Sequence, residues 1–190
     1  MASKSPTAAW KRPRCQQFCG HQHDPRLELQ MARSRISAGL LMFRRRGGTV
    51  EVLLAHPGGP FYRNKDSGVW TIPKGEIDHE GDGLLRRAQM EFEEEVGIPA
   101  ESTDWIDLGW IKQKGGKTVY AWAFEGDLPG EFQCRSNTFE MEWPPRSGKM
   151  QNFPEVDQAC FFSLEDARRK LKEAQTPFLD RLRSAMTNRT

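Results

Sequence analysis

The run Met90-Glu-Phe-Glu-Glu-Glu-Val-Gly97 decides the interpretation of this chain, because it joins a cluster of glutamates to an apolar helix face. At about 100° per residue, Glu91, Glu94 and Glu95 lie within roughly 100° of one another on one side of a helix. A separate apolar stripe would pack on a core and consists of Leu85, Ala88, Phe92 and Val96. Like charges one turn apart repel by roughly a few tenths of a kcal/mol per pair. The gathered carboxylates therefore predict a site for a hard divalent cation such as Mg²⁺, which prefers oxygen ligands.

The surroundings of this helix strengthen that interpretation. Upstream lies Trp70-Thr-Ile-Pro-Lys-Gly75, followed by a polar turn over residues 78–82. Downstream, Gly97 suits a left-handed C-cap and Pro99 follows it. The order is therefore a glycine, an acidic turn, a helix and a closing glycine.

This arrangement resembles the Nudix box, whose pattern reads Gly, five residues, Glu, seven residues, Arg-Glu-apolar-x-Glu-Glu-x-Gly-apolar. The resemblance implies an α/β fold, an α/β/α sandwich with a mixed sheet, over residues from about 35 to 187. It also implies that Glu91, Glu94 and Glu95 bind the metal and that the backbone carbonyl of Gly75 is a further ligand. Members of the family hydrolyse a nucleoside diphosphate linked to another moiety.

The first half of the box departs from the family pattern. Counted from Gly75, the box is one residue too long, so Asp82 stands where the family has its first glutamate, with Glu80 as a competing match. Met90 replaces the arginine that braces the glutamates in the family. Arg87 lies one helical turn before Glu91, and we expect it to supply the missing positive charge.

Length and composition predict one domain with an extension. Of the 190 residues, 1–34 are expected to be a disordered N-terminal extension and 35–190 the Nudix-like domain. The extension contains Cys15-x-x-x-Cys19-x-His21-x-His23, and zinc binding by these residues is left open.

The net charge of +2 argues for neither nucleic acid nor membrane as a partner. The chain lacks an apolar run of about 18 residues and a secretory signal, so we expect a cytoplasmic protein with no membrane association. Its four cysteines are too scattered for a disulfide framework. A homodimer is left open.

Two hairpins and a short strand are predicted around the box helix. Residues 36–43 and 50–55 flank Gly47-Gly48, and residues 105–112 and 117–124 flank Gly115-Gly116. A short strand is expected over residues 69–72.

The C-terminal part is expected to contain strands, a loop and two helices. We predict a strand over residues 132–138, a long loop over 140–157 and a buried strand over 158–162. Helices should begin at Ser163, with a capping-box-like start, and at Thr176, as N-cap before a proline.

Diphosphate hydrolysis needs a metal, a positioned water and a base. Glu94 and Glu95 are the strongest predicted metal ligands, and Glu91 supports or joins them. Glu155 is the favoured base outside the helix, followed by Glu140 and Glu142. The predicted catalytic residues are therefore Glu94, Glu91 and Glu155.

Substrate contacts are expected from basic and aromatic residues near the box. Lys74 and Arg63 are candidates for phosphate, and Phe61, Tyr62 or Trp70 could stack on a base.

The sequence predicts a Mg²⁺-dependent hydrolase of nucleotide-type small molecules, with Mn²⁺ as an alternative ion. The short domain and the Trp-x-x-Pro-Lys-Gly entry look most like members acting on dinucleoside polyphosphates and nucleoside triphosphates. One alternative is a nucleotide-binding regulatory module with weak turnover, motivated by Asp82, Met90 and the longer loop. Another is an RNA 5′-end pyrophosphohydrolase, for which Arg44, Arg45 and Arg46 offer a small basis.

Overall fold

The computed structural model describes residues 36–77 and 83–189. The predicted extension over residues 1–34, its Cys and His motif, and the acidic turn with Glu80 and Asp82 lie outside these described residues.

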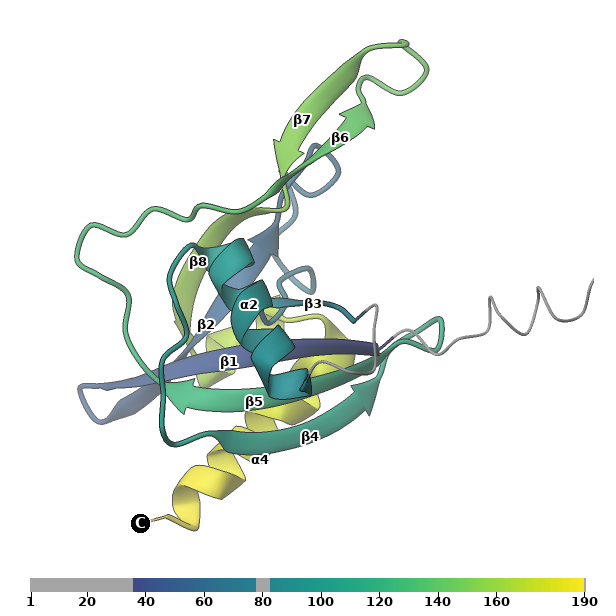
Figure 1. Cartoon of the computed structure of the whole chain (residues 1–190). Coiled ribbons are helices and arrows are strands. Elements are labelled where there is room, and N and C mark those ends of the chain that lie inside the picture. The colour runs from purple at the N-terminus through teal and green to yellow at the C-terminus, as the bar shows by residue number, and fades with distance from the viewer. Residues whose placement is uncertain (1–35, 78–82, 190) are drawn as a thin grey trace, which may run out of the picture. The chain divides into compact units, whose positions relative to one another are not determined.

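A mixed six-stranded sheet forms the centre of the domain (Figure 1). Its strands run in the order β4-β5-β1-β2-β8, and β3 pairs with β1 outside this path. β1 and β5 are parallel, whereas the other pairs are antiparallel. The strands are β1 (Ile36–Arg46), β2 (Thr49–Pro57), β3 (Lys74–Glu76), β4 (Ile106–Lys112), β5 (Thr118–Glu125) and β8 (Val156–Ser163). The two predicted hairpins, β1–β2 and β4–β5, are confirmed.

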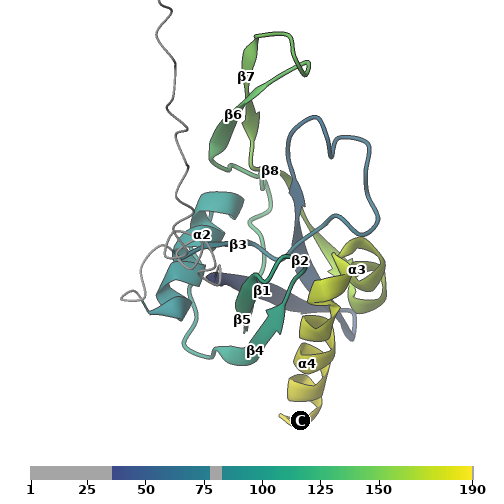
Figure 2. The same ribbon diagram turned by 90° about the vertical axis from the view of Figure 1, so that its right-hand side faces the viewer.

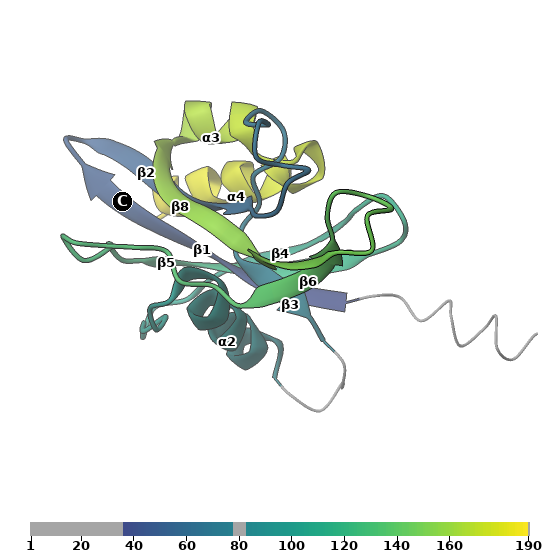
Figure 3. The same ribbon diagram turned by 90° about the horizontal axis from the view of Figure 1, so that it is seen from above.

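The sheet is covered on both faces, as Figure 3 shows from above. On one face lies α2 (Leu84–Val96), and on the other lie α3 (Leu164–Lys170) and α4 (Thr176–Thr187), with a short 3₁₀ turn, Glu173–Gln175, between them. This arrangement confirms the predicted α/β/α sandwich. None of the described helices is long and apolar enough to cross a membrane.

β1 shows why both faces need a cover. Alternate side chains of a strand point to opposite faces, so Leu40 and Met42 join the core under α2, whereas Leu41 and Phe43 join the core under α3 and α4. A strand buried on both sides reads as a continuous apolar run. This explains the near-absence of polar residues between Ala38 and Phe43.

α2 has the predicted apolar stripe and the predicted end. Ala88, Phe92 and Val96 are buried, and the Phe92 ring meets the Phe124 ring edge to face at 5.4 Å between centroids. Gly97 ends the helix with φ of 89°, a left-handed conformation that favours glycine. The helix is therefore fixed in rotation, which determines where its glutamates point.

The predictions for residues 132–157 were wrong. Residues 126–137 form no strand, and the expected loop contains a separate two-stranded sheet, β6 (Thr138–Glu142) and β7 (Met150–Pro154). This hairpin extends beyond the end of β8, near the loop that joins β2 to β3 (Figures 1 and 2). Cross-strand packing of Phe139 on Phe153, which the composition does not reveal, accompanies the pairing.

Three smaller expectations also need correction. Residues 69–72 make single bridges at Trp70 and Thr71 instead of a strand. β8 is an edge strand with exposed Cys160, so it is not fully buried. Ser163 caps α3 as predicted, but Thr176 is already helical and its hydroxyl donates to the carbonyl of Glu173 instead of capping α4.

Candidate active site

Gly75 and Glu91 form the closest contact of the site. β3 pairs antiparallel with β1 and thereby brings Gly75 against α2. A Cβ atom at Gly75 would lie only 1.8 Å from the carboxyl carbon of Glu91. The Glu91 carboxylate occupies the space that a Cβ atom at this position would need, so the backbone of Gly75 and the Glu91 carboxylate lie side by side.

The Glu91 carboxylate is buried and paired with Arg87 across one turn of α2. Burial raises the pKa of Glu91, the Arg87 charge opposes this, and the charges of Glu94 and Glu155 add to the rise. The Nε atom of Arg87 is also buried and has no hydrogen-bond partner among the described residues. Met90, in contrast, is 43% exposed. The predicted nearness of Arg87 to Glu91 is therefore confirmed.

Glu95 lies on the same side of α2 and contacts β3. The backbone N–H of Lys74 donates to Oε2 of Glu95 at 2.9 Å. Burial, with smaller contributions from the charges of Glu91 and Glu155, raises the pKa of Glu95 to about 7 against the attraction of Lys74. Burial lowers the pKa of Lys74, which the charges of Glu95 and Glu91 oppose. The half-buried Lys74 thus lies beside the carboxylates of Glu91 and Glu95, and its role as a phosphate contact stays a prediction.

Glu94 is exposed and points toward the segment before β6. Its Oε2 accepts a hydrogen bond from Nδ2 of Asn137 at 3.5 Å. A cavity of about 450 Å³ adjoins this contact and is lined by Met90, Glu93, Glu94, Arg135, Ser136 and Asn137. Asn137 was not predicted, because nothing in the local sequence marks a residue 43 positions from its partner.

Glu155 lies between β7 and β8, and its charge raises the pKa values of both Glu91 and Glu95. Its backbone is fixed on both sides: its N–H donates to the Asn137 carbonyl at 2.8 Å, and its carbonyl accepts from Gly58 N–H at 2.8 Å. The Glu155 side chain is exposed, and its charge is close enough to act on both buried carboxylates of α2.

The other two candidate bases, Glu140 and Glu142, are exposed on β6. The Glu142 carboxylate accepts from Gly148 N–H at 2.6 Å, which closes the hairpin turn.

The aromatic and basic candidates fall into two groups. Trp70 is only 3% exposed, packs edge to face on His56 and Phe162, and donates from Nε1 to Asp66, so its ring has no free face for a base. Phe61, Tyr62 and Arg63 lie on the loop between β2 and β3. Phe61 is 53% exposed and meets Trp143 of the hairpin edge to face at 5.3 Å.

The carboxylates offer the type of donor atom that a hard divalent ion prefers. They are oxygen donors, two of them are largely buried, and their mutual repulsion contributes to the raised pKa values of Glu91 and Glu95. Within residues 36–77 and 83–189, however, no three acidic, histidine or cysteine side chains are grouped closely enough to hold a metal as they stand. Each glutamate has its own partner: Arg87 for Glu91, Asn137 for Glu94 and Lys74 for Glu95. Binding would require these side chains to turn toward one another.

Comparison with known proteins identifies the family. The family model described as NUDIX domain matches residues 33–182. The chain therefore belongs to the Nudix family, which supports hydrolysis of pyrophosphate bonds as its general activity. A search of the curated proteins found no match.

Solved structures share the fold at low identity. A binary complex of Ap4A hydrolase from C. elegans is 22% identical, with a TM-score of 0.55, over 81% of this chain and 98% of that one. The NUDIX domain of Shewanella oneidensis NrtR complexed with ADP ribose is 14% identical, with a TM-score of 0.58, over 87% and 94%. The C-terminal domain of mouse MUTYH, in complex with human PCNA, is 14% identical, with a TM-score of 0.52, over 82% and 91%.

Substitution of Gly75 tests the closest contact. In Gly75→Ala the added Cβ would displace the Glu91 carboxylate, and misplacement by about 1 Å can cost about 100-fold in rate. We expect a loss of hydrolysis of that order, measured as kcat, with the thermal unfolding midpoint recorded to show that the protein folds. Gly130→Ala is the matched control, because a Cβ there meets no atom within 4 Å. Equal activity of the two variants would contradict the placement.

Substitution of Arg87 tests the charge that holds Glu91. Without Arg87 the pKa of Glu91 rises further, so ionised Glu91 is lost at a higher pH as the solution is acidified. We expect Arg87→Ala to lower kcat and to move the acid limb of the pH–rate profile to higher pH. Arg86→Ala removes a neighbouring exposed arginine and serves as control. Superimposable acid limbs of the two variants would show that Arg87 does not brace Glu91.

Proposed function

We propose that the chain is a divalent-metal-dependent hydrolase of diphosphate bonds in nucleoside diphosphate-linked substrates, with Mg²⁺ as the favoured ion and Mn²⁺ as an alternative. The observation that carries the proposal is the buried Glu91 carboxylate against the bare backbone of Gly75, with the carboxyl groups of Glu95 and Glu155 near it. Burial of several carboxylates together is costly unless a positive charge compensates them. Arg87 and Lys74 supply part of that compensation, and a bound cation would supply the rest.

Glu91, Glu94 and Glu95 would hold the ion, together with the carbonyl of Gly75. When bound, such an ion neutralises phosphate charge and favours attack at phosphorus. Glu155 is the proposed general base, because it is exposed to solvent, acts by its charge on Glu91 and Glu95, and has a backbone fixed at both N–H and carbonyl. Its carboxylate would accept the proton of the attacking water.

Dinucleoside polyphosphates and nucleoside triphosphates are the favoured substrates. The C. elegans Ap4A hydrolase and the NrtR domain complexed with ADP ribose support a nucleotide substrate. Arg63 is a proposed phosphate contact, and the exposed ring of Phe61 and the half-buried ring of Tyr62 are proposed to stack on a base.

A nucleotide-binding module with weak turnover is the second candidate function. It is favoured by one observation, that the described carboxylates each have a separate partner and are not grouped as a metal site.

RNA 5′-end processing has less support. Arg44 is paired with Glu51 and Asp127, and Arg45 with Glu125, so this basic run is largely neutralised.

A substrate panel tests the proposal. The full chain is incubated with Mg²⁺ or Mn²⁺ and with dinucleoside polyphosphates, nucleoside triphosphates, nucleotide sugars and 5′-triphosphate RNA, and products are separated by chromatography. We expect hydrolysis of a dinucleoside polyphosphate or nucleoside triphosphate that chelator abolishes and that Glu94→Gln lowers by at least about 100-fold. Glu165→Gln, on α3 across the sheet, is the control and should match the wild type.

Two results would overturn the enzyme assignment. Binding of a nucleotide without products would favour the regulatory module. Hydrolysis that Glu94→Gln leaves intact would place the chemistry elsewhere.

A further inference from the structure

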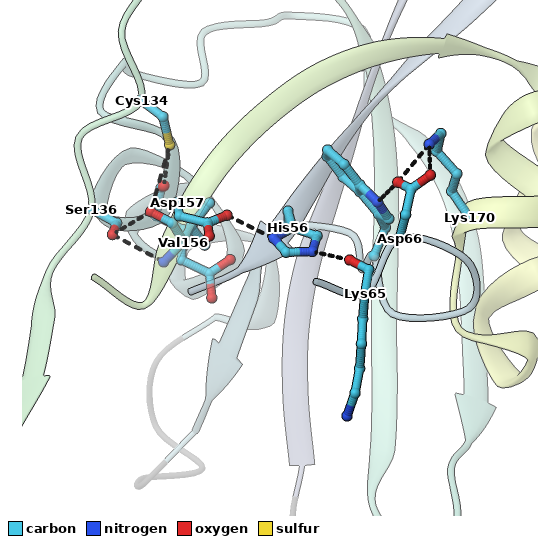
Figure 4. A network of polar contacts seen from close by, with 10 residues as sticks. His56, Lys65, Asp66, Cys134, Ser136, Val156, Asp157 and Lys170 are labelled. Atoms are coloured by element: carbon cyan, nitrogen blue, oxygen red, sulfur yellow. Dashed lines mark hydrogen bonds and ion pairs between the residues drawn. The ribbon is translucent and has the colours of Figure 1, made fainter. Parts of the chain in front are cut away.

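His56 occupies an unusual position at the end of β2, where both of its ring nitrogens face acceptors (Figure 4). Nδ1 lies 2.7 Å from Oδ1 of Asp157 on β8, and Nε2 lies 2.8 Å from the backbone carbonyl oxygen of Lys65. The histidine is only 4% exposed, so water offers little alternative to these two contacts.

The chemistry of the two acceptors determines how many ring nitrogens of His56 carry a proton. A neutral imidazole has one N–H and one lone pair, whereas the imidazolium has two N–H donors. A backbone carbonyl and an ionised carboxylate can only accept. Both contacts are therefore favourable together only when both nitrogens of His56 carry a proton.

The remaining charges around His56 are compatible with a cation. Asp157 faces it from β8, and Asp66 of the loop between β2 and β3 is near enough that His56 contributes to the lowered pKa of Asp66, after its hydrogen bonds with Lys170 and Trp70. The Trp70 ring packs against the imidazole at 5.0 Å between centroids. The positive charge of Lys170 is bonded to both oxygens of Asp66.

His56 joins two parts of the proposed active site. Lys65 belongs to the loop between β2 and β3 that carries Tyr62 and Arg63, and Lys65 N–H donates to the Tyr62 carbonyl at 2.8 Å. Asp157 follows Glu155 by two residues in the chain. At its start, the same loop is tied to Glu155 through the bond from Gly58 N–H to the Glu155 carbonyl.

We propose that His56, held as an imidazolium between Asp157 and the Lys65 carbonyl, is a positioning residue that fixes Glu155 and the Tyr62–Arg63 turn relative to each other. The catalytic part of this inference rests on the proposed function, because it takes Glu155 as the base. The structural part does not depend on any reaction. When His56 loses its second ring proton, one of its two contacts becomes repulsive. Glu155 and the Tyr62–Arg63 turn are then held less firmly relative to each other.

Nitrogen-15 NMR of the histidine ring tests the structural part directly. In the full chain, which has four histidines, the His56 signals are assigned by their disappearance in His56→Gln. We expect both ring nitrogens of His56 to carry protons at neutral pH, and a neutral single tautomer there would overturn the proposal. If His56→Gln fails to fold, substitution of His21, His23 and His79 assigns the remaining histidine signals to His56 by elimination.

Asp157→Asn then tests the role of the carboxylate. Removing its negative charge should leave only one ring nitrogen of His56 protonated at neutral pH, seen by nitrogen-15 NMR, and speed hydrogen exchange of Gly58 N–H, which reports the position of Glu155. Asp180→Asn makes the same change at an exposed carboxylate of α4 that is paired with Arg168, and both readouts should stay at their wild-type values. Unchanged ring protonation and exchange in Asp157→Asn would refute the positioning role.

The pH–rate profile tests the catalytic part. We expect the kcat of Asp157→Asn to fall about tenfold, and its pH–rate profile to decline on the alkaline side at a lower pH than the wild-type profile. The pH–rate profile of Asp180→Asn should follow the wild type. A superimposable profile for Asp157→Asn would refute the link to catalysis. If the wild type hydrolyses nothing in the substrate panel, the proposed function fails. The NMR and exchange results still decide whether His56 holds Glu155 and the Tyr62–Arg63 turn relative to each other.

Discussion

The contact between the backbone of Gly75 and the buried carboxylate of Glu91 is the constraint on which the site depends. It requires a glycine on β3, a helix rotated so that Glu91 points inward, and an apolar stripe that holds that rotation. The stripe packs on β1 and β5, which pair in parallel at the centre of the sheet. The core of the domain thus determines the position of the Glu91 carboxylate relative to β3.

Electrostatics explains why this arrangement is suited to a cation. Burial disfavours the ionised forms of Glu91 and Glu95. The charges of Glu94 and Glu155 raise the pKa of Glu91 further, and those of Glu91 and Glu155 act in the same direction on the pKa of Glu95. Arg87 and Lys74 oppose these shifts without removing them. A site with unbalanced negative charge and oxygen donors favours a hard divalent ion and, through it, the phosphates of a substrate.

The sequence was sufficient for the parts of the fold that follow from local periodicity, and insufficient where distant segments decide. The α2 stripe, the Gly97 cap and the approach of Arg87 to Glu91 all follow from helical spacing. The β6–β7 hairpin was missed because its proline-, glycine- and charge-rich composition resembles a loop. Asn137 and His56 were missed because their partners lie 43 and 101 residues away, and no local pattern encodes such contacts.

The most direct test of the central claim is a crystal structure of the full chain grown with Mn²⁺, with anomalous difference density calculated for the metal. The account predicts a peak beside the Gly75 carbonyl, with the carboxylates of Glu91, Glu94 and Glu95 turned toward it. It would be contradicted if the three carboxylates kept Arg87, Asn137 and Lys74 as their partners, with no anomalous peak between them at saturating Mn²⁺.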